Sequence, residues 1–190
     1  MTMIRPALTL IAVMTALTGL AYPLAMTGLA TAVVPHRAEG SLIVAEGGPV
    51  GSALVGQAFA GAGYLHPRPS AVDYDAAAGA GTNLGPTSAA LRDAVAERRT
   101  VWEAENGTPA PMDAVTASGS GLDPDVSLVN ARGQARRIAE ARGVDLADVL
   151  AVLAAAERRP LWGLYGSYRV NVLAANLALD AAHPMPPAAH

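Results

Sequence analysis

The N-terminal thirty-five residues constrain this chain more than any other part of it. From Pro6 to Pro35 there is no aspartate, glutamate, lysine or arginine, and the run is apolar apart from threonines and small residues. The hydrocarbon core of a bilayer, about 30 Å thick, needs roughly 20 helical residues to cross it. The run exceeds that length, with room for tilt. We therefore expect a transmembrane helix at residues 8–32.

A cleaved signal peptide is the alternative interpretation of the same residues. Arg5 would form its basic end, residues 8–20 its apolar core, and Ala30-Thr31-Ala32 its small-residue cleavage site. The length of the apolar stretch favours a retained helix, because it is longer than a typical signal core. Both interpretations send the rest of the chain across the membrane.

The few charges that flank the apolar run indicate its orientation. Arg5 and the α-amine lie on the N-terminal side, whereas Arg37 on the other side is offset by Glu39. The positive-inside rule then predicts a cytoplasmic N-terminus at residues 1–7 and an extracytoplasmic bulk domain. We expect this soluble domain at residues 36–182 and a disordered tail, rich in proline, at residues 183–190.

Composition excludes several classes of function. The chain has no cysteine, so disulfides and thiolate metal sites are ruled out. Its net charge of -3 leaves no basic surface for nucleic acid. With one Phe, two Trp and five Tyr, a stacking platform for bases is not expected either.

The pattern along the exported part mixes short strands with helices and predicts a small α/β or α+β domain. Two β-prone runs surround a Gly-Gly-Pro turn at residues 40–59, and a long loop rich in Pro and Gly follows them. Helices are expected from residue 86 to 105, from Ser127 as cap to Arg142, and from Asp145 as cap up to Arg158. A strand is expected at residues 112–118 and another at 168–172, before a closing helix.

The stretch VTASGSGLDP, residues 115–124, invites interpretation as a catalytic or phosphate-binding loop. A phosphate loop needs a lysine, and the chain has none. A nucleophile elbow needs G-x-S-x-G, which S-G-S-G does not provide. A serine hydrolase remains the alternative, with Ser118 or Ser120 as nucleophile and His66 as base. A turn whose glycines permit positive φ is the stronger interpretation.

Metal binding has little support in the sequence. The four histidines are scattered with no H-E-x-x-H, and the aspartates do not follow the spacing of a calcium loop. Arg68 could hold an anion but more often such an arginine binds a carbonyl or an acidic side chain. Trp162 and Tyr165 fit a core position or a surface that faces a partner, and the sequence does not separate the two.

Taken in order, the motifs of the chain resemble those of the C subunit of the Kdp potassium-transporting ATPase. They are RPAL (5–8), Tyr22-Pro23, GSALVGQAF (51–59), YLHPRPSA (64–71), GAGTNLGPT (79–87), VTASGSGLDP (115–124), RRIAEARG (136–143) and VNVLAANLALD (170–180). Each motif is weak alone, but their order behind one hydrophobic run is specific. One departure is Asp125, where this family commonly has histidine or asparagine, which would alter the local charge.

The resemblance implies a non-catalytic accessory subunit of an ATP-driven, high-affinity potassium importer in the bacterial plasma (inner) membrane. Its partners would be a channel-like potassium-translocating subunit, a P-type ATPase subunit and a small hydrophobic subunit. Such subunits are described as assembly factors or catalytic chaperones that raise the ATP affinity of the ATPase subunit. No cofactor is expected on the chain itself, since ATP would bind the ATPase subunit and K⁺ would be carried by the complex.

The same motifs supply the residues expected to build the fold or contact partners. These are Gln57, Phe59, Arg68, Pro69, Ser70, Asn83, Leu84, Gly85, Ser118, Ser120, Gly121, Leu122, Asp123, Asn171 and Asn176. We expect none of them to be catalytic, and we expect the outer domain to brace or cover the potassium entrance.

Overall fold

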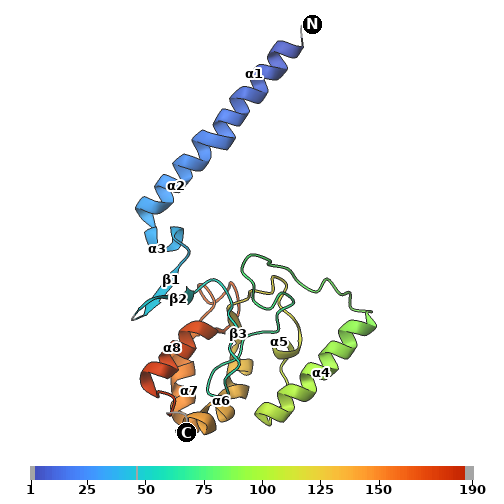
Figure 1. Ribbon diagram of the computed structural model, residues 1–190, viewed down its shortest axis with the longest axis vertical. Coiled ribbons are helices and arrows are strands. Elements are labelled where there is room, and N and C mark those ends of the chain that lie inside the picture. The colour runs from blue at the N-terminus through green and yellow to red at the C-terminus, as the bar shows by residue number, and fades with distance from the viewer. Residues whose placement is uncertain (1–2, 46, 187–190) are drawn as a thin grey trace. The chain divides into compact units, whose positions relative to one another are not determined.

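The computed structural model describes residues 3–45 and 47–186, and the chain divides into two compact units, residues 1–50 and 51–190 (Figure 1). The first unit is dominated by one helical run. It comprises α1 (Ile4–Met14), the π-helical segment η1 (Thr15–Ala21) and α2 (Tyr22–Val33). Together they form a 30-residue helix, long and apolar enough to cross a membrane, with no buried residue in its hydrophobic window.

The π-helical segment has a cause in the sequence. Pro23 lacks an N–H group and its ring would clash with the carbonyl four residues earlier, so an undisturbed α-helix cannot pass through it. The turn directly before it widens instead, at Thr15–Ala21. Thr18 donates its hydroxyl to the Met14 carbonyl at 2.7 Å, so this polar side chain is satisfied within the helix.

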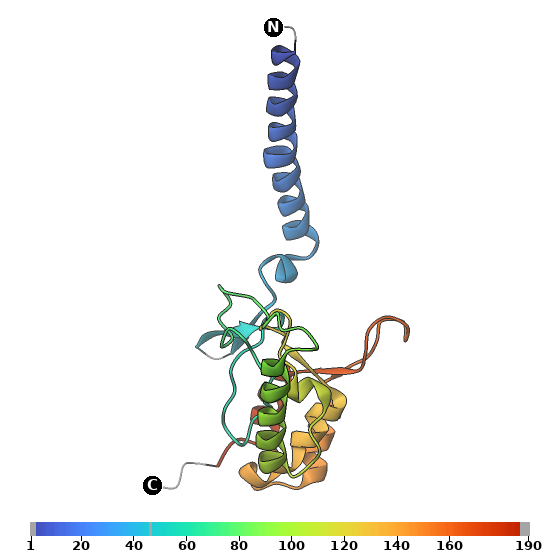
Figure 2. The same cartoon turned by 90° about the vertical axis from the view of Figure 1, so that its right-hand side faces the viewer.

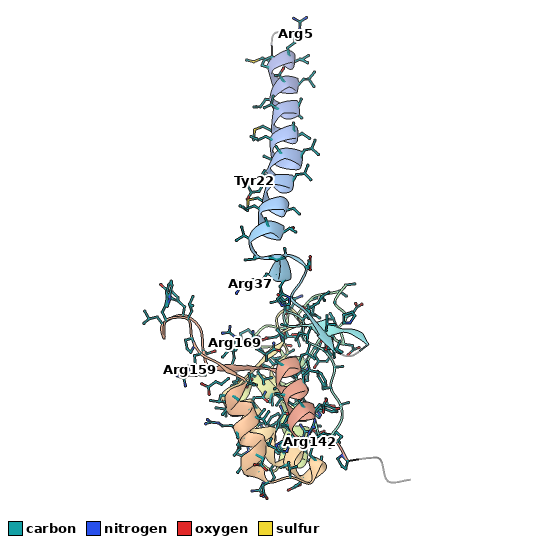
Figure 3. All side chains as sticks on the ribbon, turned by 90° about the vertical axis from the view of Figure 1, so that its left-hand side faces the viewer. Arg5, Tyr22, Arg37, Arg142, Arg159 and Arg169 are labelled. Atoms are coloured by element: carbon teal, nitrogen blue, oxygen red, sulfur yellow. The ribbon has the colours of Figure 1, made fainter. Side chains whose placement is uncertain are left out.

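Side chains project from this helix on all sides, and the labelled Arg5 and Arg37 stand near the two ends of its uncharged stretch (Figure 3). A short helix α3 (Pro35–Ala38) follows. A two-stranded sheet of β1 (Leu42–Ala45) and β2 (Gly48–Ser52) comes next. The two predicted β-prone runs are present, but Gly48 and Pro49 of the expected turn belong to β2, which ends two residues beyond the first unit.

The second unit is a small α/β domain. Its helices are α4 (Ala89–Asn106), α5 (Met112–Val115), α6 (Leu128–Arg142), α7 (Leu146–Ala155) and α8 (Val172–Ala182). Its strands are β3 (Asp125–Ser127), β4 (Glu157–Arg158) and β5 (Arg169–Asn171). The three strands form an antiparallel sheet in the order β3-β5-β4, with Val126 opposite Val170. The predicted fold class, one apolar N-terminal helix followed by a small α/β domain, is confirmed.

The core of this domain lies where α6, α7 and α8 meet the sheet. Alanines at helical spacing on α6 let the neighbouring elements approach closely. The buried apolar cluster consists of Leu65, Val126, Ala131, Ala135, Ile138, Ala139, Val149, Leu153, Val170, Val172, Ala175 and Leu179. Every member except Leu65 comes from a helix or strand, so Leu65 fixes an otherwise irregular segment to the core.

Several helix ends carry residues typical of caps; Ser127 caps α6 as predicted, whereas α4 begins at Ala89, after the expected residue 86. Ser88 and Ser127 accept hydrogen bonds from the backbone N–H groups of Leu91 and Asn130, as N-caps do. Gly107 and Gly143 adopt left-handed φ values of 64° and 67° directly after α4 and α6. Asp145 precedes α7 as predicted, but its side chain makes no capping bond.

Two expectations were wrong. Residues 112–118 do not form a strand, because Met112–Val115 is a helical turn closed by Thr116, whose hydroxyl donates to the Met112 carbonyl at 2.7 Å. So short an apolar run has no periodicity that separates helix from strand. Helix α7 ends at Ala155, before Arg158, and residues 157–158 pair with β5 instead.

The tail expected at 183–190 begins on the domain. The His183 carbonyl accepts a hydrogen bond from Nη1 of Arg142 at 2.6 Å. Residues 187–190 lie outside the described residues.

Candidate functional site

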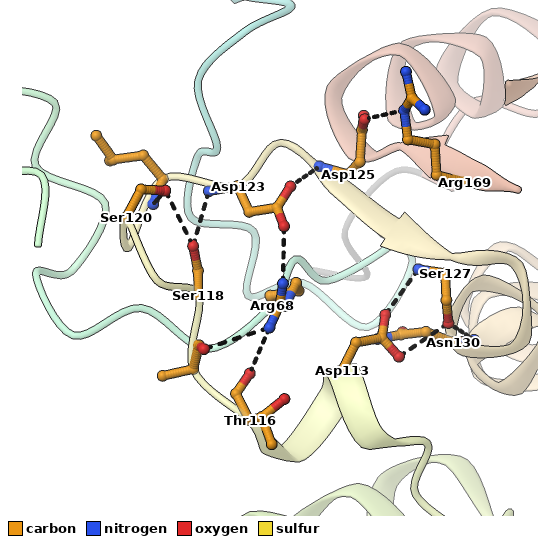
Figure 4. A network of polar contacts seen from close by, with 12 residues as sticks. Arg68, Asp113, Thr116, Ser118, Ser120, Asp123, Asp125, Ser127, Asn130 and Arg169 are labelled. Atoms are coloured by element: carbon orange, nitrogen blue, oxygen red, sulfur yellow. Dashed lines mark hydrogen bonds and ion pairs between the residues drawn. The ribbon is translucent and has the colours of Figure 1, made fainter. Parts of the chain in front are cut away.

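The loop of residues 118–124, which we call the braced turn, lies at the centre of a polar network (Figure 4). The Ser118 hydroxyl lies 3.2 Å from that of Ser120 and accepts a hydrogen bond from the Asp123 N–H at 3.3 Å. The Ser120 hydroxyl accepts from the Leu122 N–H at 3.1 Å. Both serines therefore satisfy the turn itself, as their neighbouring glycines and Asp-Pro pair predict.

Close packing explains the glycine at position 121 of the braced turn. Gly121 has φ +70°, and a Cβ there would lie 2.6 Å from Cγ2 of Val72 and 2.8 Å from the Ala80 carbonyl oxygen. The Gly56 N–H donates to the Leu122 carbonyl at 2.8 Å. Segments distant in sequence, at 56, 72 and 80, thus converge on this turn, and those at 72 and 80 leave no room for a side chain at position 121.

Arg68 ties the turn to the long irregular segment that precedes α4. Its Nη1 lies 3.0 Å from Oδ2 of Asp123, and its Nη2 reaches two backbone carbonyls, those of Thr116 and Ala117, at 3.4 Å. The next residue, Pro69, accepts a hydrogen bond from the Ser118 N–H at 2.9 Å. Arg68 is therefore a clamp rather than a free anion-binding group.

Ser70 holds the bend that follows. Its hydroxyl accepts hydrogen bonds from the N–H groups of Val72 and Tyr74, both at 3.1 Å. The Tyr74 hydroxyl in turn donates to the Arg68 carbonyl at 2.7 Å, and burial, with the charge of Asp73 as a smaller cause, raises the pKa of that tyrosine. These bonds lock the segment against the braced turn.

A polar hollow of about 220 Å³ borders the network, with Asp113, Asp123 and Asp125 in its wall. Each of these carboxylates is engaged. Asp123 pairs with Arg68, Asp125 pairs with Arg169 at 2.7 Å, and Asp113 accepts hydrogen bonds from Ser127 and Asn130. Asp125, the departure from the family pattern, thus brings a charge that an arginine on the adjacent strand neutralises.

The structure does not assemble the alternative serine–histidine pair. Nε2 of His66 lies 3.1 Å from the Gly61 carbonyl, and the backbone of His66 is bonded to Gln134. Burial lowers the pKa of His66, and the positive charge of Arg137 lowers it further. The serine hydroxyls are bonded within their own turn, so no hydrogen bond between serine and histidine is present in the described part of the chain.

Within residues 3–45 and 47–186, no group of three or more His, Cys, Asp or Glu side chains is placed to hold a metal ion. A hollow beside His66 measures about 330 Å³ and lies between α4 and the segment around Pro67, with Trp102 and Arg98 in its wall. Nothing in this hollow resembles a nucleophile paired with a base.

The structure brings together about half of the residues expected from the motifs. The group at the braced turn consists of Arg68, Pro69, Ser70, Ser118, Ser120, Gly121, Leu122 and Asp123. Phe59 packs on the core, with its ring 5.7 Å from that of Tyr64. The Gln57 side chain lies against Gly51. Asn83, Leu84 and Gly85 lie apart, exposed in the loop before α4.

Asn171 and Asn176 act as clamps on irregular backbone. Asn176 accepts a hydrogen bond from the Leu65 N–H at 2.7 Å and donates to the Leu65 carbonyl at 3.0 Å, so its amide replaces a missing neighbouring strand. Asn171 caps α8 through Ala174 and donates to the carbonyl of Ala53. Both asparagines are fully or nearly fully buried.

Sequence reasoning missed a second set of buried polar residues. Gln134 bonds both backbone groups of His66 and also accepts from Arg137 at 2.7 Å. Arg142 is 4% exposed, donates to the Gly63 carbonyl and to Asp180, and stacks over the ring of Tyr64. A usable signal existed, because Asn130 and Gln134 interrupt the apolar face of α6 one turn apart.

Comparison with known proteins agrees with this arrangement of motifs. The sequence model of the family described as "K+-transporting ATPase, c chain" matches residues 4–181. A "Potassium-transporting ATPase KdpC subunit" of Cereibacter sphaeroides is 62% identical over 182 residues, which are 96% of this chain and 98% of that protein. Proteins of the same name from Caulobacter vibrioides and Rhodopseudomonas palustris are 52% and 48% identical, and each match covers 95% of this chain and 94% or 98% of the relative. With both its helix and its domain inside the matched region, the chain belongs to the family of the potassium-transporting ATPase c chain.

Proposed function

We propose that this protein is a non-catalytic accessory subunit of an ATP-driven potassium uptake complex in the bacterial plasma membrane. Membership of the c-chain family over nearly the whole sequence is the observation that carries the proposal. The polar side chains at the braced turn support it, because they bond to one another and to backbone, as in a surface shaped for the fold or for contact.

The partners in this proposal are a channel-like potassium-translocating subunit, a P-type ATPase subunit and a small hydrophobic subunit. The helix Ile4–Val33 anchors the protein among them, with the N-terminus in the cytoplasm and the α/β domain outside. There the domain braces or covers the potassium entrance. ATP is cytoplasmic in this arrangement, so any effect of the subunit on nucleotide affinity is indirect, through assembly of the complex.

Co-purification tests the assignment of partners. A tagged chain extracted from membranes should retain the three other subunits, and its removal should abolish potassium-stimulated ATPase activity of the purified complex. Intact mass should show residues 1–32 still attached. A mature protein that begins after Ala32, purifies alone and hydrolyses esters through Ser120 would instead support the secreted hydrolase.

Labelling tests the orientation. Because the chain has no cysteine, a single introduced cysteine is a unique target. Val129, 69% exposed on α6, and Met3, 82% exposed, are suitable positions. A maleimide that cannot cross membranes should label Val129→Cys in intact spheroplasts and should label Met3→Cys only after lysis. The reverse pattern would refute the proposed orientation.

A further inference from the structure

The hairpin between β4 and β5 carries the two most exposed large apolar side chains among the described residues of the α/β domain. Its loop, residues 159–168, extends away from the helices of that domain as a narrow ribbon (Figure 2). Trp162 and Leu164 are 81% and 80% exposed, and Leu161 and Tyr165 are 59% and 68% exposed. The other tryptophan of the chain, Trp102, is only 8% exposed. We call residues 161–165 the hairpin tip.

The hairpin tip is an ordered turn. Leu161 and Tyr165 exchange two backbone hydrogen bonds, at 2.9 and 3.1 Å, and the Leu164 N–H donates to the Leu161 carbonyl at 3.1 Å. The rings of Trp162 and Tyr165 meet edge to face with centroids 6.5 Å apart. Because these backbone groups are already paired, the tip can enter an apolar medium without leaving them unsatisfied.

The charges at the base of the hairpin are mostly basic, with Glu157 as the acidic residue among them. Residues 158–168 contain two arginines, Arg158 and Arg159, and no aspartate or glutamate. Both arginines are exposed, and the Arg159 side chain is 82% exposed, with Glu157 at 3.9 Å as its distant partner. The tip thus places Trp162 and Tyr165 next to two arginines. This arrangement matches the membrane interface, where aromatic rings lie at the headgroups and arginines reach phosphates.

In the proposed arrangement, a connection of limited length tethers the domain that carries this hairpin to the bilayer. The helix ends at Val33 and the second unit starts at Gly51, so residues 34–50 form the whole connection. Even fully extended, these residues reach about 60 Å. A tethered loop experiences a high effective concentration of lipid, so a weak affinity is enough for it to bind.

We propose that the hairpin tip inserts into the lipid of the membrane that holds the N-terminal helix and provides a second attachment for the α/β domain. This inference rests on the membrane anchorage proposed above, but not on the identity of the other subunits. A protein partner is disfavoured because the tip has five residues, whereas each side of a stable protein interface contributes roughly 20–30. Lipid accepts a small convex element without a matching groove.

Trp162 is a built-in reporter for the test. The Trp102→Phe variant of the full chain leaves Trp162 as its only tryptophan. We would reconstitute it into vesicles of phosphatidylcholine and phosphatidylglycerol, with and without brominated acyl chains that quench nearby indoles. We expect a large loss of emission in the brominated vesicles and protection from aqueous iodide. If Trp102→Phe does not fold, the emission of Trp162 is obtained by subtracting the emission of the Trp162→Phe variant from that of the wild type.

Two matched variants locate the effect. In a Trp102→Phe, Trp162→Phe background, Val129→Trp reports from an exposed site on α6 of the same domain, where we expect no quenching by brominated lipid. Leu10→Trp in that background reports from the N-terminal helix and should be quenched strongly. Exchange of both Leu161 and Leu164 for serine in the first variant should restore iodide access to Trp162.

Three outcomes would overturn the inference. Trp162 could remain as open to iodide as a tryptophan at position 129 while Leu10→Trp is quenched, which would leave the anchor intact and remove the lipid contact. Protection of Trp162 only when the other subunits are present would assign the tip to a protein interface instead. Absence of quenching at Leu10→Trp would refute the anchor itself, and the inference with it.

Discussion

At the scale of single residues, the braced turn is defined by what its backbone must do. Gly119 and Gly121 lie two residues apart in the same loop, yet they differ in their surroundings. Gly121 has a positive φ and three neighbouring groups within 3.2 Å of the position of a Cβ, whereas Gly119 has open space there. The turn therefore needs glycine at one of these positions and not at the other.

Gly121→Ala should lower the free energy of unfolding by about 2–4 kcal/mol, because it combines a strained backbone with a clash against Val72 and the Ala80 carbonyl. Gly119→Ala is the matched control and should change it by less than about 0.5 kcal/mol. Urea unfolding of the full chain in detergent measures both. Equal losses at the two positions would show that the convergence of the three segments does not constrain the turn.

His66 makes the stability of the domain depend on pH. The pKa of His66 is lowered chiefly by burial, so the unfolded chain binds this proton before the folded chain does as pH falls. The contribution of the neutral His66 side chain to the free energy of unfolding is complete above the ordinary histidine pKa of about 6.5. It is lost as pH falls from there toward the lowered pKa. His66→Gln should reduce this decline, measured as thermal midpoints between pH 7.5 and 5, and the exposed His36→Gln should not.

At the scale of elements, prediction succeeded where caps and periodicity agreed. Ser127 as cap and Arg142 as last residue set the limits of α6 correctly. Short strands were missed because two or three residues carry no detectable period, and β3 and β4 exist only through pairing with β5. The motifs predicted most residues of the braced turn, but not that Arg68 bonds Asp123, since that contact joins positions 55 residues apart.

The segment before α4 is held by helices in place of a sheet. Asn176 on α8 and Gln134 on α6 bond the backbone of two consecutive residues, Leu65 and His66. Asn176→Ala would leave both backbone groups of the fully buried Leu65 without partners. We expect a loss of about 2–6 kcal/mol in the free energy of unfolding, at roughly 1–3 kcal/mol for each of the two unsatisfied groups.

Hydrogen exchange distinguishes this cause from a general loss of packing. In Asn176→Ala the amide of Leu65 should exchange much faster, while the amides of α4 keep their protection at conditions where the domain stays folded. Unchanged protection at Leu65 would mean that another group, such as a water molecule, takes over from the asparagine.

At the scale of the whole molecule, the two units have different physical roles. Every residue of the buried apolar cluster lies between positions 65 and 179, and none lies in the N-terminal helix. The helix exposes large apolar side chains along its whole length, which water would not tolerate and lipid would. The N-terminal helix thus has no part in the core of the α/β domain and serves to attach the protein, while the second unit contains the contacts that stabilise its own fold.

A chain that begins at Glu39 should therefore fold in water with the thermal midpoint of the full chain, since it keeps both strands of the first sheet and the entire core. The defect of this shortened chain should appear in its binding to the other subunits. A short tether supplies an effective concentration in the millimolar range, so the free domain at micromolar concentration should occupy the complex poorly and approach full occupancy only when added in large excess. Titrating it against complexes purified without the c chain, with ATPase activity as readout, measures this directly. Full activity at stoichiometric amounts would show that the helix is dispensable, and a lowered midpoint would show that the domain depends on it for folding.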